Sequence, residues 1–149
     1  MSHHLAQVNV AEMRAPVDDP LLADFVALLE PLNELADESP GFIWRLQTEE
    51  GDATSVSLLD DDRLLVNLSV WESPDALADY AYRSVHTEAL RRRGEWFSRM
   101  TIAHLALWWV PAGHLPVVTE AEERLTHLRK HGPTAHAFTL RRRFPRPDG

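Results

Sequence analysis

Hydrophobic and polar residues alternate along several short segments of the chain, which is typical of half-buried strands. The alternation predicts strands at residues 4–10, 42–47, 63–71 and 102–110. Successive strand side chains point to opposite sides. In the third strand, the even-numbered positions 64–70 are apolar, and Asn67 and Trp71 point together from the other face. An amide and an indole on a largely apolar face predict the wall of a small-molecule pocket.

Apolar residues three and four positions apart predict helices between the strands. The acidic and proline residues at 18–20 mark the start of the first helix. Pro31 lacks the amide donor that a helix interior uses, so we expect it to break or kink this helix. A shorter helix then resumes over 32–38. The acidic segment 49–62 is predicted to be a long hairpin loop.

A second helix is predicted over about 75–92, because Ser73 suits the N-cap and Pro74 the first helical position. A third helix over 118–130 follows the fourth strand, and 136–140 is compatible with a final short strand. The order β-α-β-β-α-β with a C-terminal addition predicts an α+β protein of the ferredoxin-like, split βαβ type with an antiparallel sheet.

The fourth predicted strand, 102–110, is apolar on both of its sides. Helices cover one face of such a sheet, so the second face also needs a cover. We expect that cover to be the sheet of a second copy, which predicts a homodimer. The length of 149 residues suits one domain, assigned to 1–140, with 141–149 as a basic, disordered tail.

Charge and composition narrow the function further. The net charge of -8 disfavours a nucleic-acid binder, which needs a basic face. No apolar run approaches the roughly 20 residues of a membrane span, and the first residues lack the features of a signal peptide. The chain has no cysteine, so thiolate chemistry and disulfides are excluded. We therefore expect a cytoplasmic protein that acts on a small molecule.

The second predicted helix carries Tyr82 and His86 one turn apart, on a stripe that can face the same volume as Asn67 and Trp71. Asn67 would hold a substrate carbonyl or oxyanion through its NH2 group, or satisfy a loop backbone. Trp71 would stack on an aromatic substrate or pack in the core. His86 is the best candidate acid or base, since imidazole titrates near neutrality, although a surface histidine without a chemical role is the alternative.

Four residues of the other strands complete the candidate site. His104 shares a face with Trp108, so we expect it to be partly buried. It would then bind a metal, accept a substrate proton, or pair with Asn67 or a tyrosine. Trp44 and Arg45 lie on opposite faces of the second strand. Arg45 suits a substrate carboxylate, bound by a bidentate fork, or a salt bridge at a subunit interface. The tryptophans fit either a pocket for a flat ligand or the core.

His127 and His131 have a helical spacing that can chelate a metal. No HExxH motif or matched acid supports such a site, and the position of His131 before Gly132 is better explained by the end of the helix. We therefore predict no metal.

Five segments, which together span nearly the whole chain, resemble those of a bacterial domain-of-unknown-function family in the dimeric α+β barrel superfamily. They are SPGFIWRLQ (39–47), LLVNLSVWES (64–73), YRSVHTEALRRRGEWF (82–97), ALWWVPAGHLP (106–116) and HGPTAHAF (131–138).

The Asn-x-x-x-Trp spacing of Asn67 and Trp71 is similar to that of the antibiotic-biosynthesis monooxygenases of the same superfamily. This resemblance implies oxidation of an aromatic or polyketide-like substrate in secondary metabolism without a cofactor, or its cyclisation or isomerisation. A first alternative is heme binding or degradation, with Asn9 or Asn67, Trp71 and His86 around the heme. A second alternative is a protein that binds a hydrophobic metabolite without turnover.

Overall fold

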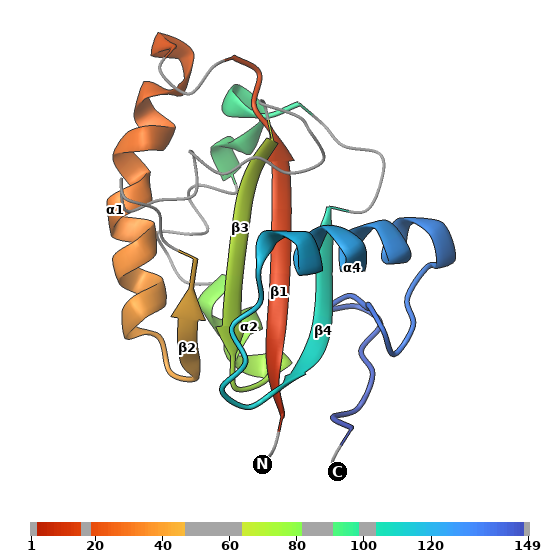
Figure 1. Cartoon of the computed structure of the whole chain (residues 1–149). Helices are drawn as coiled ribbons and strands as arrows, with labels where there is room; N and C mark the ends of the chain where they lie inside the picture. The colour runs from red at the N-terminus through yellow and green to blue at the C-terminus, as the bar shows by residue number, and fades with distance from the viewer. Residues whose placement is uncertain (1–2, 16–18, 47–63, 82–90, 99–103, 148–149) are drawn as a thin grey trace.

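The computed structural model describes residues 3–15, 19–46, 64–81, 91–98 and 104–147. Four strands form one antiparallel sheet in the order β2-β3-β1-β4 (Figure 1). The strands are β1 (His3–Glu12), β2 (Phe42–Arg45), β3 (Leu64–Trp71) and β4 (Leu105–Pro111). The helices are η1 (Pro20–Leu22), α1 (Ala23–Glu38), α2 (Pro74–Ala81) and α4 (Val118–His131), and residues 91–96 are also helical. This order and pairing confirm the predicted α+β, ferredoxin-like fold.

The two central strands determine which residues share a face of the sheet. β1 pairs antiparallel with β3 on one side and with β4 on the other. Asn9 lies opposite Asn67 in β3 and opposite Leu105 in β4. Because directly opposed residues of antiparallel strands point the same way, these three side chains belong to one face.

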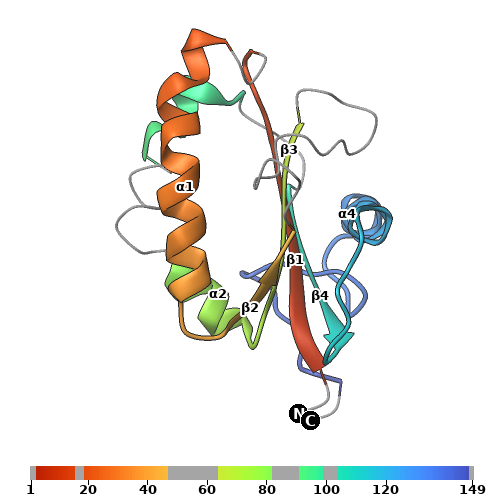
Figure 2. The same ribbon diagram turned by 60° about the vertical axis from the view of Figure 1, so that its left-hand side comes forward.

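Helices α1 and α2 lie on one side of the sheet and α4 lies on the other (Figure 2). The α4 side is apolar over the centre of the sheet, and His4 and Glu12 lie at the two ends of β1 on this side. Its even-numbered strand residues, from Ala6 and Val66 to Trp108, pack with Ala121, Leu125 and Leu128 of α4. The opposite side is mixed, and its apolar part includes Trp71 and Leu107. The apolar even-numbered residues of β3 therefore lie on one side of the sheet, and Asn67 and Trp71 lie on the other, as the sequence predicted.

The cover on the second face differs from the sequence expectation. We expected a second copy to bury this face, whereas α4 of the same chain packs on it and its strand residues are almost fully buried. The prediction of 118–130 as a helix did not include its docking on the sheet. The argument from an uncovered face therefore no longer requires a dimer, and the homodimer stays a prediction.

Helix α1 runs through Pro31 without a break, which corrects the expectation of two helices. Pro31 is exposed, and so is Ala27, whose carbonyl would have accepted the missing bond. Water can therefore satisfy that carbonyl. Buried Phe25 and Ala36 hold the two halves against the sheet. At α2 the predicted cap is confirmed, because Ser73 Oγ accepts from the amide of Ala76 at 3.2 Å.

The segment from residue 134 onward lies along β4 and α2. Residues 136–140 were expected as a possible strand, and the structure has one isolated bridge there, in which Phe138 pairs with Leu107 through two backbone bonds of 2.8 Å. Residues 141–147, which belong to the predicted tail, also contact the rest of the chain. Phe144 packs against the core, and its carbonyl accepts from the indole N–H of Trp109 at 3.0 Å. The guanidinium of Arg146 lies 5.0 Å from the Trp109 ring.

A close approach of backbone and helix fixes the start of β2. Gly41 has φ +82°, and a Cβ built there would meet the Cβ of Ala76 in α2 at 2.5 Å. Glycine is required here both for the left-handed conformation and for the space. None of the described residues forms a helix with the length and apolar character to cross a membrane.

Candidate functional site

Polar side chains gather at the centre of the sheet, on the side that faces α1 and α2. Gln7 and Asn9 of β1 lie opposite Ser69 and Asn67 of β3. We call these four residues the polar strip. Apolar clusters flank it on both sides. One contains Leu5, Trp71 and Leu107, and the other contains Met13, Phe25 and Trp96. The strip is therefore a polar band between two apolar clusters.

Gln7 is the centre of the strip's hydrogen bonds. Its side chain is 3% exposed, and its Nε2 donates to Asn67 Oδ1 and to Ser69 Oγ, both at 2.7 Å. Ser69 Oγ also accepts from the indole Nε1 of Trp71 at 2.8 Å. A buried amide that uses both of its N–H groups holds its neighbours in one orientation.

This network orients the amide of Asn67. Its Oδ1 is occupied by Gln7, so the NH2 group is the end that remains for another partner. Among the described residues, none accepts a hydrogen bond from that NH2 group. Asn67 and Asn9 are exposed, although Gln7 and Ser69 beside them are buried. Solvent therefore reaches a donor that buried groups hold in place.

Trp71 lies beside the strip but inside the core. It is 1% exposed, stacks on Tyr80 with ring centres 5.2 Å apart, and meets the edge of Phe42 at 5.3 Å. The sequence correctly placed Trp71 on the same face as Asn67. Of its two sequence-based roles, packing in the core agrees with the burial. Its N–H positions Ser69.

Tyr80 joins the same cluster from α2 and stays protonated at neutral pH. Burial is the main cause that raises its pKa to about 12, Arg45 opposes this effect, and Asp37 adds to it. Its hydroxyl donates to the carbonyl of Leu32 in α1 at 3.3 Å. The phenol is therefore a hydrogen-bond donor that ties α2 to α1, and it is unsuited to act as a base.

Arg45 lies on the same face as the strip, because it is opposite Ser69, whereas Trp44 is opposite Val70 and packs on the α4 side. The predicted opposition of the two residues is therefore correct. The guanidinium of Arg45 binds Asp37 of α1 through bonds of 2.9 and 3.3 Å. This ion pair lies within the chain, so both sequence-based roles of Arg45, a substrate carboxylate and an interface salt bridge, stay predictions.

Two more predicted site residues, Trp108 and His104, are not beside Asn67. Trp108 is fully buried on the α4 side, where its indole N–H donates to Glu120 at 2.8 Å. His104 was expected to be partly buried in a strand, but it precedes β4 and is exposed. Leu105 lies opposite Asn9 and therefore points to the same face as the strip. Because side chains alternate along a strand, position 104 belongs with Ala106 and Trp108 on the other face. Tyr82 and His86 lie outside the described residues.

Gln7 is the site residue that sequence reasoning missed. The segment Leu5–Val10 was interpreted only as an alternating strand, although Gln7 and Asn9 are two positions apart and must share a face. Two neutral polar side chains on one face of a central strand match the pair Asn67 and Ser69 on the next strand. That repeated pattern was the available signal.

A family model described as "Domain of unknown function (DUF3291)" matches residues 4–149. No curated protein sequence matches the chain.

Solved structures resemble the chain in fold. A conserved protein from Methanosarcina mazei Go1 has a TM-score of 0.51 and 14% identity, covering 74% of this chain and 92% of that chain. Protein SO0527 from Shewanella oneidensis has a TM-score of 0.51 and 11% identity, with the same coverage of 74% and 92%. SnoaB, a cofactor-independent oxygenase from Streptomyces nogalater, has a TM-score of 0.47 and 16% identity, covering 76% and 96%. The two structures with a TM-score of 0.51 show that the chain shares their fold.

Proposed function

Since the chain belongs to the DUF3291 family, whose description assigns no activity, we propose a function from its own residues: cofactor-independent chemistry on an aromatic or polyketide-like small molecule at Asn67. The observation that carries this proposal is the solvent-accessible NH2 group of Asn67, which Gln7 orients by occupying the amide oxygen. A donor held in advance stabilises a negative oxygen better than one that must first be reoriented.

The surroundings favour an apolar, ring-shaped substrate. The polar strip lies between two clusters rich in aromatic side chains, so a ligand over Asn67 would meet apolar groups on both sides of its polar contact. A few polar groups on an apolar surface are typical of small-molecule sites.

The proposed chemistry begins with loss of a proton from the substrate, which leaves an enolate or phenolate oxygen for Asn67 to stabilise. In an oxidation, the carbanion reacts with O2, a methylene carbon becomes a carbonyl, and the second oxygen atom leaves as water. In a cyclisation or isomerisation, the same enolate rearranges without O2. We propose His86 as the base because it comes four residues after Tyr82 in the sequence, which is one turn of the predicted helix.

A test uses a tricyclic aromatic ketone with an acidic methylene, such as anthrone, with oxygen uptake and product formation measured together. Asn67→Ala and Asn67→Asp should each lower kcat by about 10²–10³, the usual effect of losing one oxyanion donor. Asn67→Asp keeps the side-chain shape, replaces the NH2 donor by a carboxylate oxygen and adds a negative charge, whereas Asn67→Ala removes the donor without adding charge. His104→Ala is the control and should not change the rate, because its position has the parity of the opposite face.

The outcomes separate the alternatives. Product without oxygen uptake would mean cyclisation or isomerisation. Saturable binding that needs Asn67 but gives no product with any tested aromatic ketone or phenol would mean a hydrophobic-ligand binder. Unchanged turnover in both Asn67 variants would refute the assignment of the site.

A further inference from the structure

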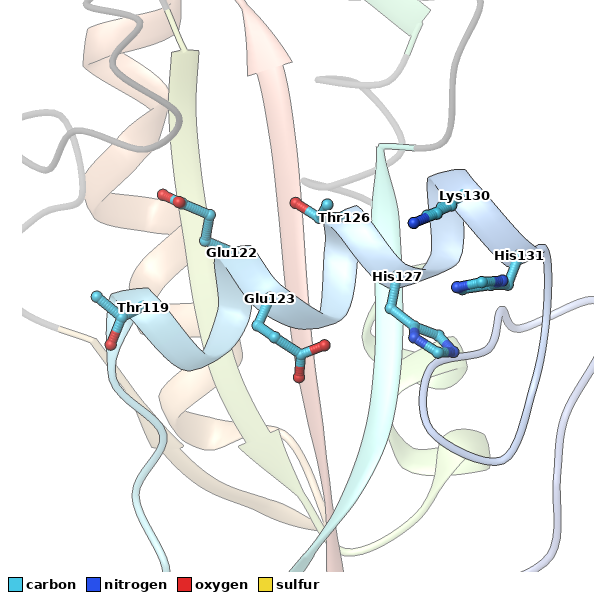
Figure 3. Close-up of a pocket in the computed structure, with 7 residues that line it drawn as sticks. All are labelled: Thr119, Glu122, Glu123, Thr126, His127, Lys130 and His131. Atoms are coloured by element: carbon cyan, nitrogen blue, oxygen red, sulfur yellow. The ribbon is translucent and has the colours of Figure 1, made fainter.

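The side of α4 that faces away from the sheet carries imidazoles and a carboxylate. Glu123, His127 and His131 follow one another at intervals of four residues, so they lie along one stripe of the helix (Figure 3). They line a shallow depression of about 410 Å³. This stripe lies on the opposite side of the sheet from the polar strip, and its role is independent of the proposed function.

His136, in the segment after α4, joins this stripe. Its Nε2 lies 2.7 and 3.0 Å from the two carboxylate oxygens of Glu123. The ring of His127 is 4.5 Å from the ring of His136 and 4.5 Å from the ring of His131, measured between centres. One ligand atom from each of Glu123, His127 and His136 can be chosen so that all three lie within 4.8 Å of one another.

Local backbone structure holds His136 in this position. α4 ends at Gly132, which has φ +74° and turns the chain back along the helix. Thr134 Oγ1 accepts from the amide of His136 at 3.2 Å, and Arg124 of α4 donates to the His136 carbonyl at 2.8 Å. The third candidate ligand is therefore placed by a defined turn.

We propose that Glu123, His127 and His136 form a binding site for one divalent transition-metal ion. Two imidazole nitrogens and one carboxylate oxygen are a donor set that Zn²⁺ uses, with further positions filled by water or another ligand. Tetrahedral ligands of Zn²⁺ lie about 3.3 Å apart, so ligand atoms that lie within 4.8 Å of one another need to approach by no more than about 1.5 Å to close the site. Imidazole donors disfavour Mg²⁺ and Ca²⁺, which prefer oxygen.

The spacing of His127 and His131 alone predicted no metal site, because no matched acid was recognised for them in the sequence. The acid is Glu123, one turn before His127, and the third donor comes from beyond the helix end. Phe138 already joins the segment after α4 to β4. A metal bound by His136 would join the same segment to α4 as well.

The test is a titration of the full-length, metal-free protein with Zn²⁺ against a coloured chelator, with the visible spectrum of bound Co²⁺ as a second readout. We expect one equivalent to bind per chain. His127→Ala, His136→Ala and Glu123→Gln should each weaken binding by about tenfold or more. Zn²⁺ should raise the thermal midpoint of the unchanged protein and not that of His136→Ala.

Two controls make the result specific. His114→Ala removes an exposed histidine that pairs with Glu120 at 2.7 Å, and it should leave Zn²⁺ affinity unchanged. A variant with His3 and His4 both replaced by alanine should also bind normally. Absence of saturable Zn²⁺ binding, or binding that survives His136→Ala and disappears without His3 and His4, would overturn the proposal.

Discussion

Ser69 is the residue whose loss tests the polar network most directly. Its Oγ accepts from Gln7 Nε2 at 2.7 Å and from Trp71 Nε1 at 2.8 Å, and all three side chains are buried. Ser69→Ala removes one oxygen and leaves two buried N–H groups without that acceptor. Each unpaired buried donor costs about 1–3 kcal/mol, so we expect the free energy of unfolding to fall by about 2–6 kcal/mol.

The assay is urea unfolding followed by circular dichroism, which avoids a signal from the tryptophan that one variant removes. Ser98→Ala, at an exposed position, is the matched control and should change stability by less than about 0.5 kcal/mol. Trp71→Phe removes one of the two donors. In that background Ser69→Ala should therefore cost about 1 kcal/mol less.

A loss below about 0.5 kcal/mol for Ser69→Ala would refute the reasoning, because it would mean that the two donors find other partners. A full loss with no coupling to Trp71→Phe would refute the indole bond alone. Neither result depends on knowing a substrate.

Three further predictions concern the helices and the C-terminal segment. In Tyr82→Phe, Tyr80 is the remaining tyrosine, and absorbance should show that it ionises with a pKa of about 12. The free energy of unfolding should fall as pH rises from 10 to 12, because the folded state holds the tyrosine proton more tightly than the unfolded state. Ionisation near pH 10 would contradict this. Gly113 has a similar φ of +92° with open space around it, so Gly113→Ala should cost about 1–2 kcal/mol in chemical denaturation. Gly41→Ala should cost more, because the added Cβ would also meet α2. Equal costs would disprove that contact. Phe144→Ala should lower stability by about 1–3 kcal/mol in the same assay, and no change would mean that the C-terminal segment does not pack.

Local patterns predicted the strands well because they depend on neighbouring residues only. The alternation in β3 placed Asn67 and Trp71 on one face, and Ser73 and Pro74 located the start of α2. The continuity of α1 was not predictable in the same way. It depends on whether the carbonyl one turn before Pro31 faces water, which is set by the packing of the whole helix.

The site was predicted only in part because its contacts join distant segments. The partner of Asn67 is Gln7, 60 residues earlier, and only the register of β1 on β3 brings them together. The same register, through β4, excludes His104 and Trp108 from that face. In the histidine cluster, spacing gave His127 and His131, but His136 required the turn at Gly132.

The place of β1 in the sheet has a consequence for biosynthesis. β1 is a central strand, yet both of its partners come later in the chain, and roughly 90 residues separate its end from the start of β4. At typical translation rates of about 5–20 residues per second, the edge of β1 that will pair with β4 stays unpaired for roughly 5–20 s. A nascent chain that has not yet reached Pro111, the end of β4, therefore carries an exposed, aggregation-prone strand. We expect the nascent chain to need chaperones most during that interval.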